Sequence, residues 1–126
     1  GVKEIIKYCK QQEIKLAFVS STSKNNINSI FFCLRDSLNK KDFDFIGNSK
    51  LVKKLKPSAE IYKLALKELK LKPKECIAIE DTQVSLNSAV KAKLKCFIFP
   101  GNFHRSKKFN GAFKEISKIN KNIFKS

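Results

Sequence analysis

Apolar residues follow two alternating patterns along this chain, one typical of amphipathic helices and one typical of buried strands. Apolar positions at helical spacing predict helices that bury one face. Short, nearly continuous apolar runs predict strands that are covered on both faces, as in a parallel sheet. Helices are predicted over residues 1–12, 25–34, 58–69 and 84–92, with a last amphipathic helix within 103–126, and strands over 14–19, 43–46, 76–79 and 96–99.

This alternation of helices and strands is the pattern of an α/β protein with a mainly parallel sheet. The chain has 126 residues, of which 42% are hydrophobic, a composition typical of one globular domain. No apolar run reaches the roughly 20 residues that a membrane-spanning helix needs, and the first residues do not resemble a signal peptide. We therefore expect residues 1–126 to form one soluble, cytoplasmic domain with no membrane partner.

The net charge of +16, from 27 Lys+Arg against 11 Asp+Glu, raises the question of a nucleic-acid partner. Clustered cations bind nucleic acids by releasing counterions from the phosphates. Here the lysines are spread through every segment, and the only arginines are Arg35 and Arg105. A general bias toward Lys and Asn explains this charge better than a nucleic-acid site does.

The cysteines Cys9, Cys33, Cys76 and Cys96 are widely spaced, with no Cys-x-x-Cys pair of the kind that binds zinc. Three of them lie inside apolar stretches. We expect them to be reduced thiols that pack as small apolar groups.

Polar residues follow two of the predicted strands, at the edge of a parallel sheet where binding sites form. Ser20 and Ser21 come directly after the strand 14–19 and ahead of a helix. Their hydroxyls and the backbone N–H groups there suit a phosphate oxygen. A serine-rich helix cap explains the same residues equally well.

Glu80 and Asp81 follow the strand 76–79 directly. Adjacent carboxylates repel one another unless a cation lies near them, so Mg²⁺ is a natural ligand. An acidic helix start is the alternative interpretation. Lys56 precedes Pro57 and a helix, and only its order among the other motifs makes it informative.

The runs Leu16–Ser23, Lys56–Tyr62, Cys76–Thr82 and Ala89–Ala92 resemble, in this order, the later part of the haloacid dehalogenase (HAD) superfamily. The resemblance is strongest to its β-phosphoglucomutase-like phosphatases and mutases, and it covers about residues 1–101. It implies a Rossmann-like parallel sheet with flanking helices. It also implies a Mg²⁺-dependent enzyme that transfers a phosphoryl group from a small phosphorylated metabolite.

By this resemblance, Ser20 corresponds to the residue that hydrogen-bonds the transferring phosphoryl group, with Ser21 beside it. Lys56 corresponds to the lysine that neutralises charge on the phosphate and the nucleophile. Glu80 and Asp81 correspond to the acidic pair that binds Mg²⁺. Such roles agree with the chemistry, because phosphoryl transfer depends on positioning and on electrostatic stabilisation of oxygens.

The chain departs from the family in lacking the first motif, Asp-x-Asp-Gly, which supplies the aspartate nucleophile. Asp42 and Asp44 have the Asp-x-Asp spacing, but Phe45 follows in place of Gly, ahead of a strand. The family's helical cap is absent as well. Smaller departures are Ser85 and Lys93, at positions where the family usually has Gly.

In the family the first strand is central, so its absence predicts two unpaired strand edges facing one another. We expect the 126 residues to be inactive alone and an upstream segment or another chain to supply that strand. The alternative function is a degenerate, non-catalytic HAD-like domain that binds anionic partners through its basic surface. His104 and Arg105, after the last predicted strand, are candidates for a phosphate contact but more typical of a solvated loop.

Overall fold

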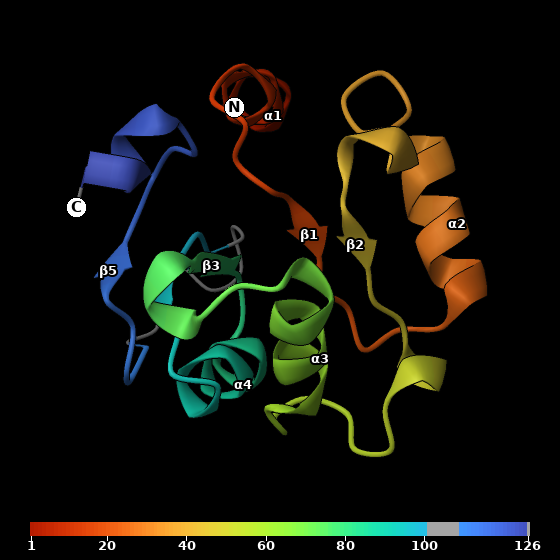
Figure 1. Ribbon diagram of the computed structural model, residues 1–126, viewed down its shortest axis with the longest axis vertical. Coiled ribbons are helices and arrows are strands. Elements are labelled where there is room, and N and C mark those ends of the chain that lie inside the picture. Colours follow the sequence, from red (N-terminus) through yellow and green to blue (C-terminus); the bar gives the residue numbers. More distant parts are fainter. Residues whose placement is uncertain (101–108, 126) are drawn as a thin grey trace.

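Helices and parallel strands alternate along the chain as the apolar patterns predict (Figure 1). The computed structural model describes residues 1–100 and 109–125. Its helices are α1 (Val2–Gln11), α2 (Lys24–Cys33), α3 (Glu60–Leu69) and α4 (Gln83–Lys91). Its strands are β1 (Ala17–Phe18), β2 (Phe45–Ile46), β3 (Ile77–Glu80), β4 (Lys95–Ile98) and β5 (Lys114–Glu115). The predicted α/β class is confirmed.

The strands form two separate parallel sheets, one of order β1-β2 and one of order β3-β4-β5. Ala17 is in register with Phe45 in the first sheet, and Ile77 with Lys95 in the second. Within the described residues, no ladder joins β1 to β3. The strand predicted over 14–19 is correspondingly short, because only two of its residues find a neighbouring strand.

The carboxyl-terminal segment differs from the predicted amphipathic helix. Lys114–Glu115 lies beside β4 as a parallel strand, and Phe113 N donates to the carbonyl oxygen of Cys96 at 2.8 Å. Within its described part, the helical portion is the 3₁₀ helix Lys121–Lys125. Backbone groups along an open strand edge need partners. That demand overrides the helical spacing of the apolar residues, as tertiary context often does.

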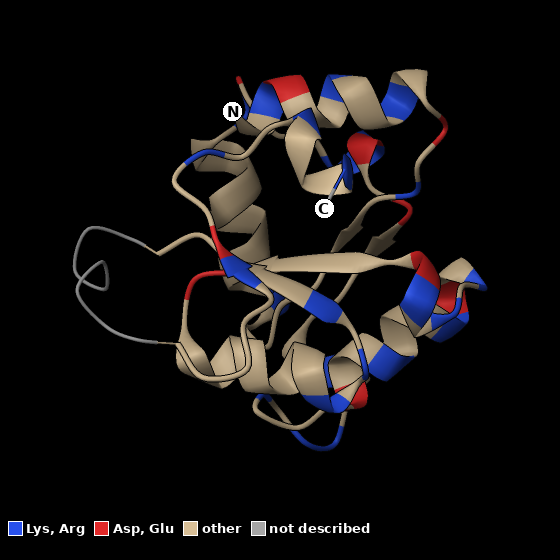
Figure 2. Ribbon diagram, turned by 90° about the vertical axis from the view of Figure 1, so that its left-hand side faces the viewer, with Lys and Arg blue, Asp and Glu red and all other residues tan. Residues whose placement is uncertain are grey.

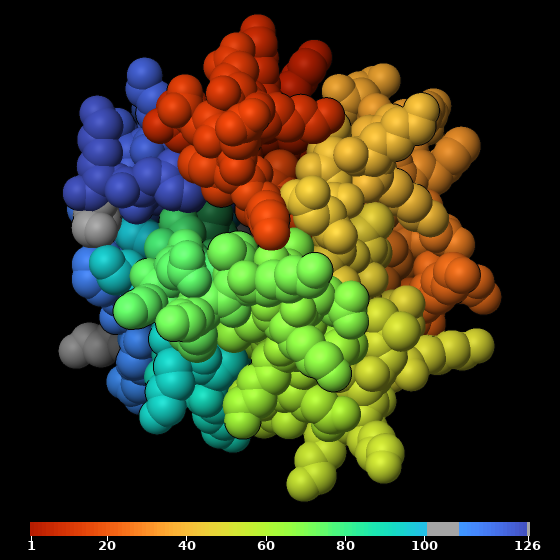
Figure 3. Space-filling view, viewed as in Figure 1, coloured from red at the N-terminus to blue at the C-terminus, as the bar shows by residue number. Residues whose placement is uncertain are grey.

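The two faces of β4 enter two different apolar clusters, because successive side chains on a strand point to opposite faces. Cys96 and Ile98 pack with α3 and α4 in one cluster, and Phe97 packs with α1, α2 and the carboxyl-terminal segment in the other. Tyr8 of α1 stacks on Phe124, with ring centroids 5.8 Å apart. Figure 3 shows the amino-terminal residues (red) against the carboxyl-terminal ones (blue). Residues near both ends of the chain therefore pack in the cluster that contains Phe97.

All four cysteines are free thiols. Cys9 and Cys96 are buried and Cys76 is half-buried, whereas Cys33 at the end of α2 is exposed, so the expectation that the cysteines pack as small apolar groups is wrong for Cys33. Burial raises the pKa of Cys9, and it raises the pKa of Cys96 to about 12. The described helices include none with the length and apolar character required to cross a bilayer.

Gly47, directly after β2, allows a close approach between β2 and α3. A Cβ at this position would lie 2.8 Å from Ile61 Cδ1 and 3.1 Å from Phe45 Cε2. Gly47→Ala should therefore lower the free energy of unfolding by about 1–3 kcal/mol, the usual cost of overpacking. Denaturant unfolding measures this change.

Ile61→Val provides the matched control, because it removes Cδ1, the nearest atom to the new methyl group. The double variant should lose less stability than the two single variants added together. Strict additivity would contradict the proposed contact.

Candidate active site

A buried ion pair lies where β1 and β3 end. Lys56 Nζ is 2.8 Å from Glu80 Oε2 and donates to the carbonyl oxygen of Val19 at 3.1 Å. The two charged side chains are only 8% and 11% exposed. Glu80 is the last residue of β3 and Val19 follows β1, so Lys56 connects the two sheets across the carboxyl ends of their strands.

Tyr62 completes this group from the first turn of α3. Its buried hydroxyl donates to Glu80 Oε2, the same oxygen that accepts from Lys56. The Lys56 ammonium lies 5.2 Å from the centre of the Tyr62 ring. Burial first, and then the charge of Glu80 and the hydrogen bond to it, raise the pKa of Tyr62 well above its ordinary value.

Sequence reasoning assigned no role to Tyr62, although it ends the Lys-Pro-x-x-x-x-Tyr run. A tyrosine beside Ile61 on a helix normally indicates core packing, because its ring is apolar. The available signal was its hydroxyl, which needs a partner when the ring is buried. Its place near Lys56 and Glu80 depends on the fold.

The serines after β1 lie in the loop that leads into α2. Ser20 Oγ accepts from Thr22 N at 3.1 Å, and Ser21 Oγ accepts from the backbone N–H of Lys56 at 3.0 Å. Ser23 caps α2 by accepting from Asn26 N at 3.1 Å. Ser21 thus fixes the backbone of Lys56, while Ser20 stabilises its own turn beside it.

Two helices begin at this edge of the sheets, α2 after β1 and α4 after β3. Thr82 caps α4, with its side chain accepting from Ser85 N at 3.2 Å. Helix amino termini carry partial positive charge and unpaired N–H groups, which favour anions. The edge that holds Lys56 is therefore suited to a phosphate group.

The predicted metal ligands Glu80 and Asp81 differ in their surroundings. Asp81 is exposed and makes no hydrogen bond or ion pair within the described residues, whereas Glu80 is engaged through Oε2. The described residues contain no group of three or more His, Cys, Asp or Glu side chains that would enclose a metal. Two carboxylates fit Mg²⁺ in part, since this ion usually keeps several waters and takes only one or two carboxylates from the protein.

Polar side chains on α3 and α4 hydrogen-bond the backbone of the loop that carries Lys56. Ser88 on α4 is fully buried and donates to the carbonyl oxygen of Ser58 at 2.6 Å. The carboxylate of Glu60 accepts from the backbone N–H groups of Lys53 and Lys54 at 2.8 and 2.9 Å, and these bonds lower its pKa. The Lys56–Pro57 peptide bond within this loop is cis. Neither Ser88 nor Glu60 was expected from the sequence to support the site.

The remaining candidates lie elsewhere. Asp42 and Asp44 precede β2, at the opposite end of the strands from Glu80, and Asp44 accepts from Leu16 N at 2.8 Å. This position agrees with the prediction that they do not replace the first motif. His104 and Arg105 lie outside the described residues.

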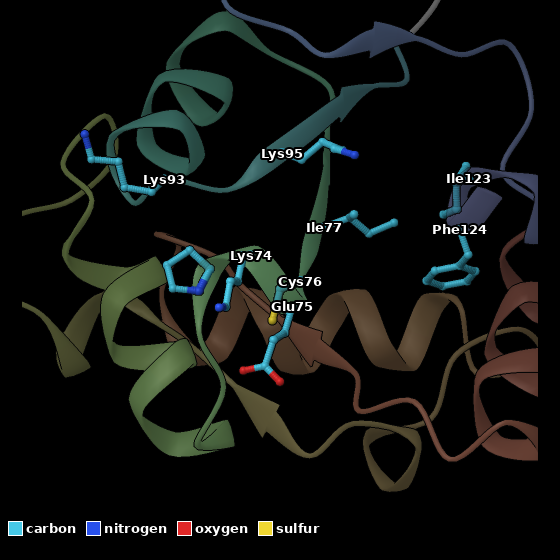
Figure 4. A pocket seen from close by; sticks show the side chains of 9 residues that line it. Lys74, Glu75, Cys76, Ile77, Lys93, Lys95, Ile123 and Phe124 are labelled. Atoms are coloured by element: carbon cyan, nitrogen blue, oxygen red, sulfur yellow. The ribbon is translucent and has the colours of Figure 1, made fainter. Parts of the chain in front are cut away.

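A cavity of about 460 Å³ opens at the other edge of the second sheet (Figure 4). Its lining includes Phe124 and three residues at the amino-terminal ends of β3 and β4, namely Cys76, Ile77 and Lys95. It is therefore separate from the group around Glu80. Figure 2 shows that Lys and Arg positions (blue) are distributed over helices and loops in the upper and lower parts of the view, with neutral residues (tan) between them.

Comparison with known proteins gives a consistent result. The sequence profile of the family described as haloacid dehalogenase-like hydrolase matches residues 1–99. The protein CbbY of Cereibacter sphaeroides is 34% identical over 112 residues, which is 89% of this chain and 49% of that protein. The chain thus spans about half the length of this relative.

Solved structures agree with the sequence comparison. The structure of CbbY from Rhodobacter sphaeroides in complex with xylulose-(1,5)bisphosphate has a TM-score of 0.84 at 33% identity, covering 92% of this chain and 52% of that one. The structure of a β-phosphoglucomutase homologue from Thermotoga maritima has a TM-score of 0.77 at 26% identity, covering 92% and 54%. The resemblance drawn from the sequence motifs is confirmed at the level of the family.

Removal of the Lys56 ammonium should destabilise the fold, because it leaves the Glu80 carboxylate buried beside one hydroxyl donor. Breaking a buried pair in this way costs about 3–5 kcal/mol, so Lys56→Met should lower the free energy of unfolding at neutral pH by about 3 kcal/mol. Lys10→Met is the matched control, since the Lys10–Asp42 pair has a 54% exposed lysine side chain. That change should cost about 0–1 kcal/mol. Equal effects of the two substitutions would contradict a stabilising role of the buried Lys56–Glu80 pair.

The ionisation of Tyr62 should depend on Glu80. The sequence has two tyrosines and no tryptophan, so in Tyr8→Phe the phenolate absorbance reports Tyr62 alone. Adding Glu80→Gln removes the negative charge that opposes phenolate formation, and the pKa of Tyr62 should fall while staying above the ordinary value because of burial. An unchanged absorbance titration would show that the hydroxyl does not contact Glu80.

Proposed function

Because the chain belongs to the haloacid dehalogenase-like hydrolase family, we propose that it supplies the phosphate-, lysine- and metal-binding part of a Mg²⁺-dependent phosphoryl-transfer site. The observation that carries this proposal is the buried pair Lys56–Glu80 at the carboxyl ends of β1 and β3. It brings together two motifs that are 24 residues apart in the sequence. A basic interaction module would have no need for this arrangement.

The proposed roles follow the chemistry of each group. The Ser20 hydroxyl and the N–H groups at the start of α2 bind phosphoryl oxygens, with Ser21 keeping the Lys56 backbone in place. The Lys56 ammonium neutralises negative charge as the phosphoryl group moves. Glu80 and Asp81 bind Mg²⁺, which when present would offset charge on the phosphoryl oxygens.

The nucleophile in this proposal comes from outside the 126 residues, since no Asp-x-Asp-Gly occurs in them. A strand ending in that motif would find backbone partners on the edges of β1 and β3, which share no ladder within the described residues. The aspartate oxygen would form a bond to phosphorus as the bond from phosphorus to the ester oxygen breaks. The leaving oxygen takes a proton, and water or a sugar hydroxyl then receives the phosphoryl group.

The proposed substrate class is a small phosphorylated metabolite, with sugar phosphates as the first candidates. Support comes from the complex of the related CbbY with xylulose-(1,5)bisphosphate. The positive ends of α2 and α4 beside Lys56 suit an anionic ester of this kind.

The proposal is tested by supplying the missing motif. The chain joined to an amino-terminal segment with an apolar strand ending in Asp-x-Asp-Gly should release phosphate from members of a sugar phosphate panel when Mg²⁺ is present. Lys56→Met, Glu80→Gln and Asp81→Asn should each lower the rate by about 100-fold, as loss of one electrostatic contact does. Lys10→Met should leave it unchanged, because its pair with Asp42 is remote from this edge.

Phosphate release that survives these substitutions would overturn the assigned residues. Absence of release from every ester would overturn the enzyme proposal. Nucleic-acid binding that falls steeply with salt and persists in Glu80→Gln would then favour the interaction module instead.

A further inference from the structure

The two oxygens of the Glu80 carboxylate are not equivalent. Oε2 accepts from both Lys56 Nζ and Tyr62 Oη, whereas no donor among the described residues bonds to Oε1. A carboxylate offers about four lone-pair positions, two on each oxygen. Two donors therefore use the hydrogen-bonding capacity of Oε2, and Oε1 remains available to a cation.

The donors on Oε2 are themselves difficult to displace. The Tyr62 hydroxyl is buried, and the Lys56 side chain is 8% exposed, so neither can turn readily to bulk water. Lys56 also donates to the carbonyl oxygen of Val19. A cation bound to Oε2 would displace these donors and leave them buried without a hydrogen-bond partner, which costs free energy.

This asymmetry has a consequence for the choice of cation. Mg²⁺ requires near-octahedral geometry and retains several waters, so a single carboxylate oxygen satisfies it. Ca²⁺ takes six to eight oxygen ligands and often binds both oxygens of one carboxylate. Building on the Mg²⁺ site proposed above, we infer that Tyr62 and Lys56 restrict Glu80 to one-oxygen ligation and thereby select Mg²⁺ over Ca²⁺.

In this account Tyr62 is a positioning residue, because it acts on the cation only through Glu80. Neighbouring groups that orient a metal ligand are worth about 10–100-fold in affinity. Loss of the hydroxyl frees a lone pair on Oε2 and permits two-oxygen ligation. The preference for Mg²⁺ over Ca²⁺ should then fall by about tenfold, the lower end of that range.

Calorimetric titration of the whole chain with MgCl₂ and, separately, with CaCl₂ tests this inference without any assay of activity. Tyr62→Phe keeps the packed ring and removes only the hydroxyl, and it should lower the Mg²⁺/Ca²⁺ affinity ratio by about tenfold. Tyr8→Phe is the matched control, since Tyr8 stacks on Phe124 far along the chain from this group. Its ratio should equal that of the unaltered chain.

A second variant keeps the test decisive if Tyr62→Phe unfolds, which circular dichroism would show. Lys56→Gln removes the second donor to Oε2, the charged ammonium. The affinities for both cations should rise because a positive charge is lost, and the ratio should again shift toward Ca²⁺. An unchanged ratio in both folded variants would overturn the selectivity inference alone. Binding of neither cation by the unaltered chain, or binding that survives Glu80→Gln and Asp81→Asn together, would overturn the metal site itself and the inference with it.

Discussion

The attraction between the Lys56 ammonium and the Glu80 carboxylate is the interaction on which the rest of this structure depends. Charges this deeply buried are tolerated only when they are paired and hydrogen-bonded. The pair, 2.8 Å apart, meets that condition with help from the Val19 carbonyl and the Tyr62 hydroxyl. The two sheets share no backbone ladder within the described residues, and this ion pair links their adjacent strand ends.

The supports of this pair come from several parts of the chain. Ser21 fixes the Lys56 backbone from the β1 loop, and Ser88 fixes the following loop from α4. Each support is a short polar side chain that reaches a single backbone group. Such contacts cost little conformational entropy, because serine has few rotatable bonds. The geometry around Glu80 is therefore set by the surrounding elements rather than by the ion pair alone.

Much of the fold and the main site residues could be predicted from the sequence, because they rest on local patterns. Apolar spacing predicts the ends of α1 to α4 to within two residues. The position of Glu80 directly after an apolar run predicts that it lies at the carboxyl end of a strand, where binding sites form. The carboxyl-terminal strand β5 could not be predicted, since its pairing with β4 depends on an edge formed elsewhere in the chain. The roles of Tyr62 and Ser88 could not be predicted for the same reason. Their hydroxyls face partners 18 and 30 residues away, and no local pattern carries that information.

Among the four cysteines, Cys33 is the most accessible attachment point for a spectroscopic label, since Cys76 is half-buried and burial raises its pKa. A thiol reacts as its thiolate, so Cys9 and Cys96, both buried and with raised pKa, are protected from alkylating reagents. Cys33 is exposed at the end of α2, on the side of the molecule that carries β1 and β2. A fluorophore or spin label attached there would report on the surroundings of α2 and the first sheet, with no engineered cysteine in the chain.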